Sequence, residues 1–189
     1  MTPRRAAIVW GIVVATIVIG SAMFVMRPRK TTPPVPATPP QTTTAAPEDR
    51  MIKARLFYVA EDGRKLTSME QDVRYAARPV DQAKELIEAQ LAPVADPVLS
   101  AIPAGTKLRA LFVTREGEAF VDLSGEVSSA QGGGVLDELL TVYTIVHALT
   151  ANMPAITAVQ VLVEGKEVDT LAGHVDLRRP LLKNSAWVQ

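Results

Sequence analysis

Two histidines and a few carboxylates are the side chains of this sequence best suited to chemistry. His174 stands two residues before Asp176, and a carboxylate beside an imidazole can orient it for acid–base catalysis. With Asp122, this pair forms the main enzymatic hypothesis, a cell-wall-related or small-ligand hydrolase. His147 differs, because it lies within the apolar segment 145–149. That setting predicts a packed, hydrogen-bonded histidine.

The sequence offers no recognisable nucleophile, metal or cofactor motif around these residues. The absence of cysteine excludes a cysteine nucleophile, an iron–sulfur ligand set and a cysteine-anchored lipoprotein. The two histidines lack the spacing of a zinc site. Asp122-Leu123-Ser124 lacks a nucleophile elbow, and its polar residues are typical of side chains that bond nearby backbone. We therefore predict no catalytic, cofactor-binding or metal-binding residues and no enzymatic activity.

Gln131 and the three glycines at 132–134 precede an apolar segment, so phosphate binding has to be considered. A P-loop needs Gly-Lys-Ser/Thr after its glycines, whereas here Asp137 follows two apolar residues. That carboxylate would repel phosphate, and we predict a connecting loop instead. The segment 102–106 (Ile-Pro-Ala-Gly-Thr) is predicted to be a structural turn.

The elements that must position these residues follow an α+β pattern. Strand-like segments cover 54–60, 65–73, 107–114, 118–123 and 157–164, with a last strand near Val168. A helix begins at Pro79, and a second covers 135–151, apolar around so much of its surface that we expect cover on two sides. The order β-β-α-β-β-α-β-β predicts a mixed β-sheet packed by two helices.

A charge-free apolar segment, residues 6–26, precedes this domain. Its length matches a hydrocarbon core of roughly 30 Å, which predicts one transmembrane helix. Both flanks are basic, so charge does not orient it. A cleaved signal peptide is the alternative. Residues 31–50 are rich in Pro and Thr, typical of an extended linker. We expect an anchor (1–30), a linker (31–50) and a domain (51–189) outside the bacterial inner (cytoplasmic) membrane, because a single N-terminal anchor usually exports the larger C-terminal part.

The net charge of zero is an average of unlike parts. The first 30 residues hold five of the 20 basic residues and no acidic one, so the rest carries 15 basic against 20 acidic residues. An acidic domain is poorly suited to neutralising phosphates. We therefore predict no nucleic-acid partner.

Several short motifs of the domain occur in a familiar order between residues 54 and 182. Together they resemble the GerMN domain of sporulation and spore germination proteins. The motifs are Leu56-Phe57-Tyr58, Ile102-Pro103-Ala104-Gly105-Thr106, Val121-Asp122-Leu123-Ser124, Val163-Glu164-Gly165 and Gly173-His174-Val175-Asp176-Leu177. The resemblance implies an α/β-type domain of bacterial envelope proteins, without established catalytic residues, here in a single copy.

The expected function is a non-catalytic protein-interaction or structural module of the bacterial cell envelope, linked to sporulation-type or germination-type assembly. Its expected partners are the membrane, through residues 6–26, and an envelope protein. An exposed sheet edge near Val168 is one expected contact surface, through strand addition. The alternative is a cell-wall-related ligand-binding sensor or hydrolase, and the sequence predicts no particular oligomeric state.

Overall fold

The computed structural model describes residues 50–132 and 134–189, which belong to a unit covering Ala45–Gln189. The predicted membrane helix at 6–26 and nearly all of the predicted linker lie outside the described residues. Within the described part of the chain, no helix is long and apolar enough to cross a membrane.

The first two strands form a hairpin of their own. β1 (Met51–Val59) pairs antiparallel with β2 (Leu66–Arg74), which confirms the strands predicted at 54–60 and 65–73. Ala54, Leu56 and Tyr58 alternate along one face of β1, and all three are buried.

A second, mixed sheet holds the remaining strands. β3 (Leu108–Val113) and β4 (Glu118–Leu123) form an antiparallel hairpin, and β4 runs parallel to β5 (Ala158–Val163). The other edge of β5 pairs with β6 (Lys166–Glu167) at one end and β7 (Leu181–Leu182) at the other. Parallel pairing of β4 and β5 requires a crossover, which α3 (Glu126–Ser129) and α4 (Val135–Thr150) supply.

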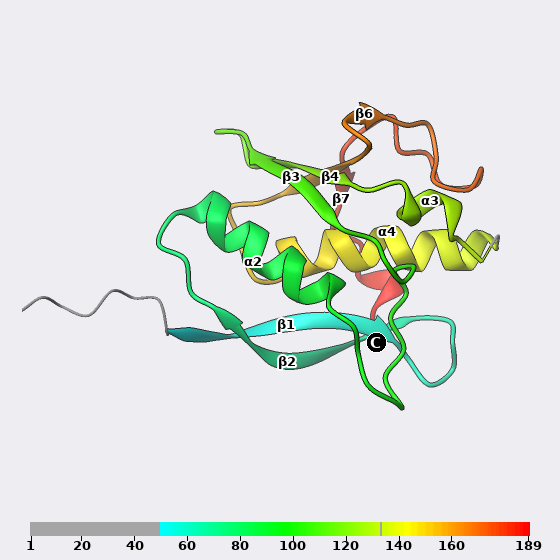
Figure 1. Cartoon of the computed structure of the whole chain (residues 1–189), viewed down its shortest axis with the longest axis horizontal. Coiled ribbons are helices and arrows are strands. Elements are labelled where there is room, and N and C mark those ends of the chain that lie inside the picture. Colours follow the sequence, from blue (N-terminus) through cyan, green and yellow to red (C-terminus); the bar gives the residue numbers. More distant parts are fainter. Residues whose placement is uncertain (1–49, 133) are drawn as a thin grey trace, which may run out of the picture. The chain divides into compact units, whose positions relative to one another are not determined.

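The longer helices lie between the two sheets, as Figure 1 shows. α2 (Pro79–Leu91) begins at the predicted proline and buries Ala83, Leu86 and Ile87. α4 contacts β1 on one side and β5 on the other, so ten of its residues are buried. This confirms the prediction that α4 is covered on two sides.

The expected single sheet is in fact two, because other groups fill the outer edge of β1. The Asn152 side-chain amide accepts from the N–H of Arg55 (2.8 Å) and donates to its carbonyl (2.7 Å). Gln90 of α2 makes the same pair of bonds with Phe57, both 2.8 Å. These side chains satisfy backbone groups that a further strand would otherwise pair. In addition, the short helix α3 lies between β4 and α4, in a segment for which no helix was predicted.

Replacing Gln90 with leucine is expected to lower the free energy of unfolding by about 2–5 kcal/mol. The change leaves the buried N–H and carbonyl of Phe57 without hydrogen-bond partners, which costs about 1–3 kcal/mol for each group. Urea unfolding of a fragment covering residues 45–189 measures this. In the control, Gln71→Leu removes one part-buried bond to the Tyr58 hydroxyl and should cost about 0.5–1.5 kcal/mol. Equal losses in the two variants would contradict this role for Gln90.

Candidate functional site

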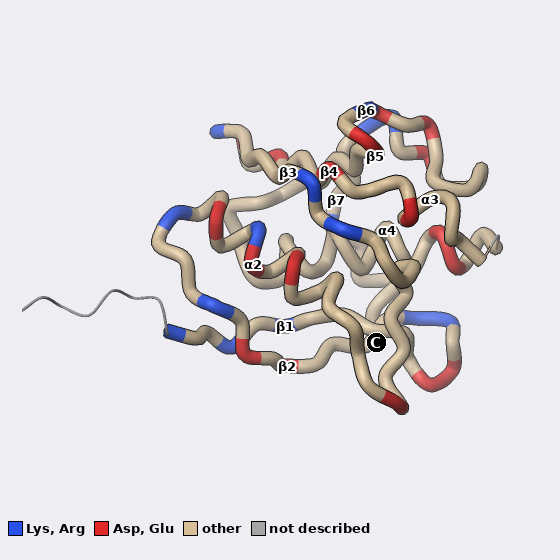
Figure 2. The backbone as a smooth tube through the Cα atoms, in the orientation of Figure 1, with Lys and Arg blue, Asp and Glu red and all other residues tan. Residues whose placement is uncertain are grey.

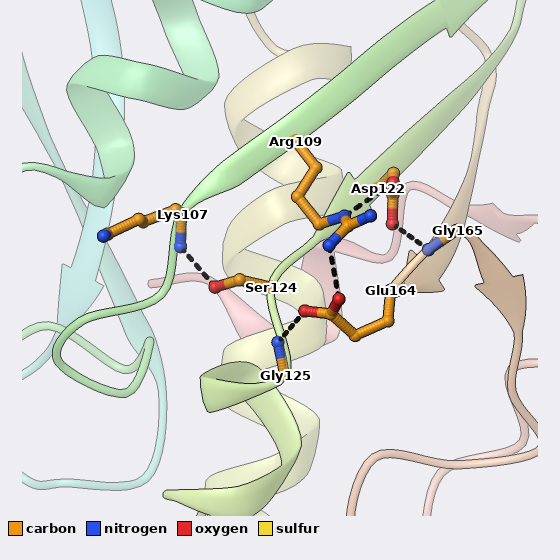
Figure 3. A network of polar contacts seen from close by, with 7 residues as sticks. All are labelled: Lys107, Arg109, Asp122, Ser124, Gly125, Glu164 and Gly165. Atoms are coloured by element: carbon orange, nitrogen blue, oxygen red, sulfur yellow. Dashed lines mark hydrogen bonds and ion pairs between the residues drawn. The ribbon is translucent and has the colours of Figure 1, made fainter.

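The parallel pairing of β4 and β5 places their carboxyl ends at one edge of the larger sheet. Leu123 aligns with Val163, so two motifs about 40 positions apart in the sequence lie side by side. Arg109 of β3 reaches the same place from a register shift between Leu108 and Ala110, an irregularity that can re-aim a side chain. We call Arg109, Asp122 and Glu164 the strand-end network (Figure 3).

The strand-end network joins three strands through two carboxylates. Asp122 accepts from the Gly165 N–H through Oδ1 (2.7 Å) and from Arg109 Nε through Oδ2 (3.2 Å). Glu164 accepts from Arg109 Nη1 through Oε2 and from the Gly125 N–H through Oε1 (2.8 Å). The Asp122 side chain is only 9% exposed, whereas those of Arg109 and Glu164 are about half exposed.

These contacts hold the chain in a tight turn after β5. Glu164 and Gly165 have φ values of +52° and +75°, and two successive positive φ values are typical of a type I′ hairpin turn. At the end of β4, the Ser124 hydroxyl accepts from the Lys107 N–H at 2.9 Å. Asp122 and Ser124 therefore bond nearby backbone, as predicted for the end of a strand.

Replacing Asp122 with asparagine is expected to destabilise the domain by about 1–3 kcal/mol. The NH₂ group of the new amide must face either the Arg109 donor or the Gly165 N–H, so one of the two hydrogen bonds is lost in either orientation. The matched control, Asp72→Asn, removes the charge of an exposed ion pair with Lys53, which should cost at most about 1 kcal/mol. Urea unfolding at pH 7 compares the two. A larger loss at Asp72 would show that the strand-end network is not structural.

A second carboxylate, Glu138, fastens the loop 171–175 to the first turn of α4. Its side chain is fully buried and accepts 2.8 Å hydrogen bonds from the N–H groups of Leu171 and His174. Burial tends to raise the Glu138 pKa, but hydrogen bonds from the N–H groups of residues 171, 172, 174 and 175 outweigh it and hold this pKa below its ordinary value. The positive end of the helix dipole favours the same charge state.

The structure gives the three residues of the enzymatic hypothesis three different partners. The His174 Nδ1 lies 3.1 Å from Glu138 Oε2, not beside Asp176. Asp176 forms a two-pronged ion pair with Arg178 (2.7 and 2.9 Å), which holds the Asp176 pKa well below its usual range. Asp122 bonds Arg109. The described residues also contain no group of three or more His, Asp or Glu that could hold a metal ion.

His147 is a packed core residue, which confirms the sequence prediction. It is 1% exposed, and its Nε2 lies 2.9 Å from the carbonyl oxygen of Asn184, so this nitrogen must carry the proton. Burial lowers the His147 pKa, although the Asn184 carbonyl opposes this by favouring the charged form. The ring packs 5.2 Å from that of Phe57. His147 thereby helps to seat the C-terminal segment on α4 and β1.

A hollow of about 400 Å³ lies beside the segment 100–104 and the start of α4. Two of its polar side chains bond the protein itself: Ser100 Oγ accepts from the Ile102 N–H, and Gln131 donates to the Thr141 hydroxyl at 3.1 Å. The third, Asp137, lies so close to Gly132 that a Cβ there would stand 2.9 Å from its Oδ2. An anion entering the glycine run would meet this carboxylate, which argues against a phosphate site.

The face of the larger sheet that points away from the helices carries apolar side chains. Phe112 pairs with Phe120 across β3 and β4, and these residues alternate with buried Leu111 and Val121. Leu182 of β7 lies on the same face. It pairs with Ala158, which alternates along β5 with the residues that face the helices. Phe112 and Leu182 are 63% and 65% exposed. We call Phe112, Phe120, Leu162 and Leu182 the outer sheet face.

Comparison with known proteins identifies relatives of this fold. The family described as sporulation and spore germination (Germane) matches residues 55–169. The first GerMN domain of the sporulation protein GerM from Bacillus subtilis is 18% identical, with a TM-score of 0.53, over 71% of this chain and 98% of that one. The tandem GerMN domains of GerM give 15% identity and a TM-score of 0.55, over 72% of this chain and 48% of the tandem.

A third similar structure is a candidate lipoprotein from Clostridium perfringens. It is 24% identical, with a TM-score of 0.50, over 71% of this chain and 89% of that one. No curated protein sequence matches the chain significantly. These structures share the fold, and the half-length match to the tandem fits a single GerMN copy in this chain.

Proposed function

The chain belongs to the sporulation and spore germination (Germane, GerMN-type) family, and we propose that residues 51–189 act as a non-catalytic interaction module of the bacterial cell envelope. The observation that carries this proposal is how the polar residues are used. Asp122, Glu164, Glu138 and Asp176 direct their carboxylates to backbone N–H groups and arginines of the domain itself. On the outer sheet face, by contrast, Phe112 and Leu182 are largely exposed to solvent.

The membrane part of the proposal rests on residues 6–26, whose uncharged length suits a single transmembrane helix. The likeness to a candidate lipoprotein supports attachment to a membrane, and a chain without cysteine needs a different anchor. The domain would then lie outside the inner membrane, tethered by the Pro/Thr-rich linker. Tethering raises its effective concentration near other envelope proteins. Sporulation-type or germination-type assembly is the proposed setting.

In-cell photo-crosslinking of the full chain tests this proposal. A photoreactive amino acid at Phe120 samples the outer sheet face, and one at Glu70, exposed on β2, serves as the control position. We expect Phe120 to capture an envelope protein that Glu70 does not, and we expect the capture to disappear when residues 1–30 are removed. Equal capture from both positions, or capture of cytoplasmic proteins alone, would overturn the proposal.

A further inference from the structure

A small pocket lies where the β1–β2 hairpin, the end of α4 and the C-terminal segment meet. Its volume is about 240 Å³, below the roughly 300–1,000 Å³ of pockets that hold drug-sized ligands. The pocket therefore suits one small chemical group. Phe57, Ala151 and Val188 supply an apolar part of its wall, and none of its lining residues is Asp or Glu.

Both charged side chains of the lining are basic, so we call it the cationic pocket. Arg55 comes from β1 and Lys183 from the segment after β7, and both are exposed. Neither forms an ion pair in the described part of the chain, whether with Glu70, the cross-strand partner of Arg55, or with the carboxylate of Gln189. Figure 2 shows basic and acidic residues mixed over the domain as a whole. The excess of positive charge is thus local to this pocket.

The fold holds the two cations near the same end of α4. Asn152 bonds both main-chain groups of Arg55, and Nη2 of Arg55 lies 3.4 Å from the carbonyl oxygen of Ala151. A guanidinium carries five N–H donors, so most of those of Arg55 stay available for a ligand. The charge of Lys183 helps to lower the His147 pKa, which places its ammonium group near that ring.

Two serine hydroxyls add neutral donors to the cationic pocket. Ser68 pairs with Phe57 across the hairpin, and Ser185 begins the short 3-10 helix Ser185–Trp187. Both residues are exposed. Within the residues that the structure describes, neither hydroxyl bonds another protein group, unlike the polar side chains of the 400 Å³ hollow. The two hydroxyls can therefore donate to oxygen atoms of a ligand.

This set of donors matches an oxyanion, and its position favours a singly charged one. An arginine fork fits both carboxylate and phosphate oxygens. The cationic pocket, however, lies at the C-terminal end of α4, where the helix dipole places partial negative charge. That end opposes a phosphate, which carries up to two charges, more than it opposes a carboxylate. The apolar part of the wall can receive a short aliphatic stem.

We infer that the cationic pocket binds the carboxylate of a short apolar peptide. Arg55 and Lys183 would neutralise its charge, and Ser68 and Ser185 would donate to its oxygen atoms. No residue of the outer sheet face lines this pocket. The inference therefore adds a second binding site, for a ligand of a different class, and does not rest on the proposed protein partner.

NMR titration of the full chain in detergent micelles tests this inference, with acetyl-dialanine as the probe. We expect saturable shifts of the amide signals of residues 183–189. The amide of the same compound keeps the apolar stem but lacks the charge, and it should bind at least about ten-fold more weakly. Equal binding of the acid and its amide would overturn the inference. Tighter binding of inorganic phosphate than of the acid would overturn the assignment to a carboxylate.

Charge variants provide the second arm of the titration. Arg55→Gln and Lys183→Gln should each weaken binding of the acid at least about three-fold, and together at least about ten-fold. Lys53→Gln is the matched control, because Lys53 lies on the same strand but pairs with Asp72 at 2.8 Å and does not line the pocket. It should leave binding unchanged within about two-fold. Equal losses in Arg55→Gln and Lys53→Gln, with amide spectra that show both variants folded, would overturn the inference.

Discussion

Replacing Glu138 with alanine is expected to lower the free energy of unfolding by roughly 3–5 kcal/mol at pH 7. Hydrogen bonds to a charged group contribute about 1.5–3 kcal/mol each, and this buried carboxylate accepts two of 2.8 Å from Leu171 and His174. Without it, the loop 171–175 loses its attachment to α4. Urea unfolding of the 45–189 fragment measures the loss. The control, Glu116→Ala in the exposed β3–β4 turn, should change it by less than about 0.5 kcal/mol.

The same carboxylate should make stability depend on pH in a defined direction. The pKa of Glu138 in the folded state is below its ordinary value of about 4.5, so its contribution is complete above that value. It is lost as the pH falls through the lower, folded-state pKa. The stability difference between the natural protein and Glu138→Gln should therefore shrink as the pH falls from 6 to 3. A difference that stays constant with pH would show that the charge of Glu138 does not stabilise the fold.

Replacing Gly117 with alanine is expected to lower the free energy of unfolding by about 2–5 kcal/mol. Gly117 closes the β3–β4 turn with a φ of +89°, and its carbonyl accepts from the Thr157 N–H at 2.9 Å. A Cβ there would overlap the backbone oxygen of Ala155, which cannot move as a side chain could. Positive φ alone costs roughly 1–2 kcal/mol, and overpacking adds about 1–3 kcal/mol.

Gly63→Ala is the matched control for Gly117. Gly63 also has a positive φ, +68°, but nothing lies within 4 Å of the added Cβ. Its substitution should cost only the conformational part, about 1–2 kcal/mol. Thermal and urea unfolding of both variants separate the two contributions. Equal losses at the two glycines would show that the contact between the β3–β4 turn and the start of β5 is unimportant.

The sequence predicts those parts of the fold that depend on local patterning. β4 lies at the predicted 118–123, α2 begins at Pro79, and α4 ends one residue before the predicted end. Alternation, helical spacing and proline are properties of neighbouring residues, which explains this success. The ordered motifs also predicted the GerMN fold, which the family match and the similar structures confirm.

Contacts between distant residues could not be predicted in the same way. Asp176 stands two residues from His174, yet its bidentate pairing with Arg178 is stronger, and His174 bonds Glu138, 36 positions away. The separate hairpin depends on the amides of Gln90 and Asn152, whose reach to β1 becomes apparent only when the helices are packed. The position of Glu138 in the first turn of a helix is visible in the sequence, but no local pattern indicates that its side chain binds the loop 171–175.

The proposed function requires that the outer sheet face contact the envelope partner and that His174 serve only the fold. The most direct test is binding of the crosslinked envelope protein to the purified full chain and to two variants, with unfolding midpoints confirming that each is folded. We expect Phe120→Glu to weaken binding at least about ten-fold, because it places a charge on the outer sheet face, and His174→Ala to leave binding unchanged. Loss of binding in His174→Ala, with binding retained in Phe120→Glu, would contradict the claim.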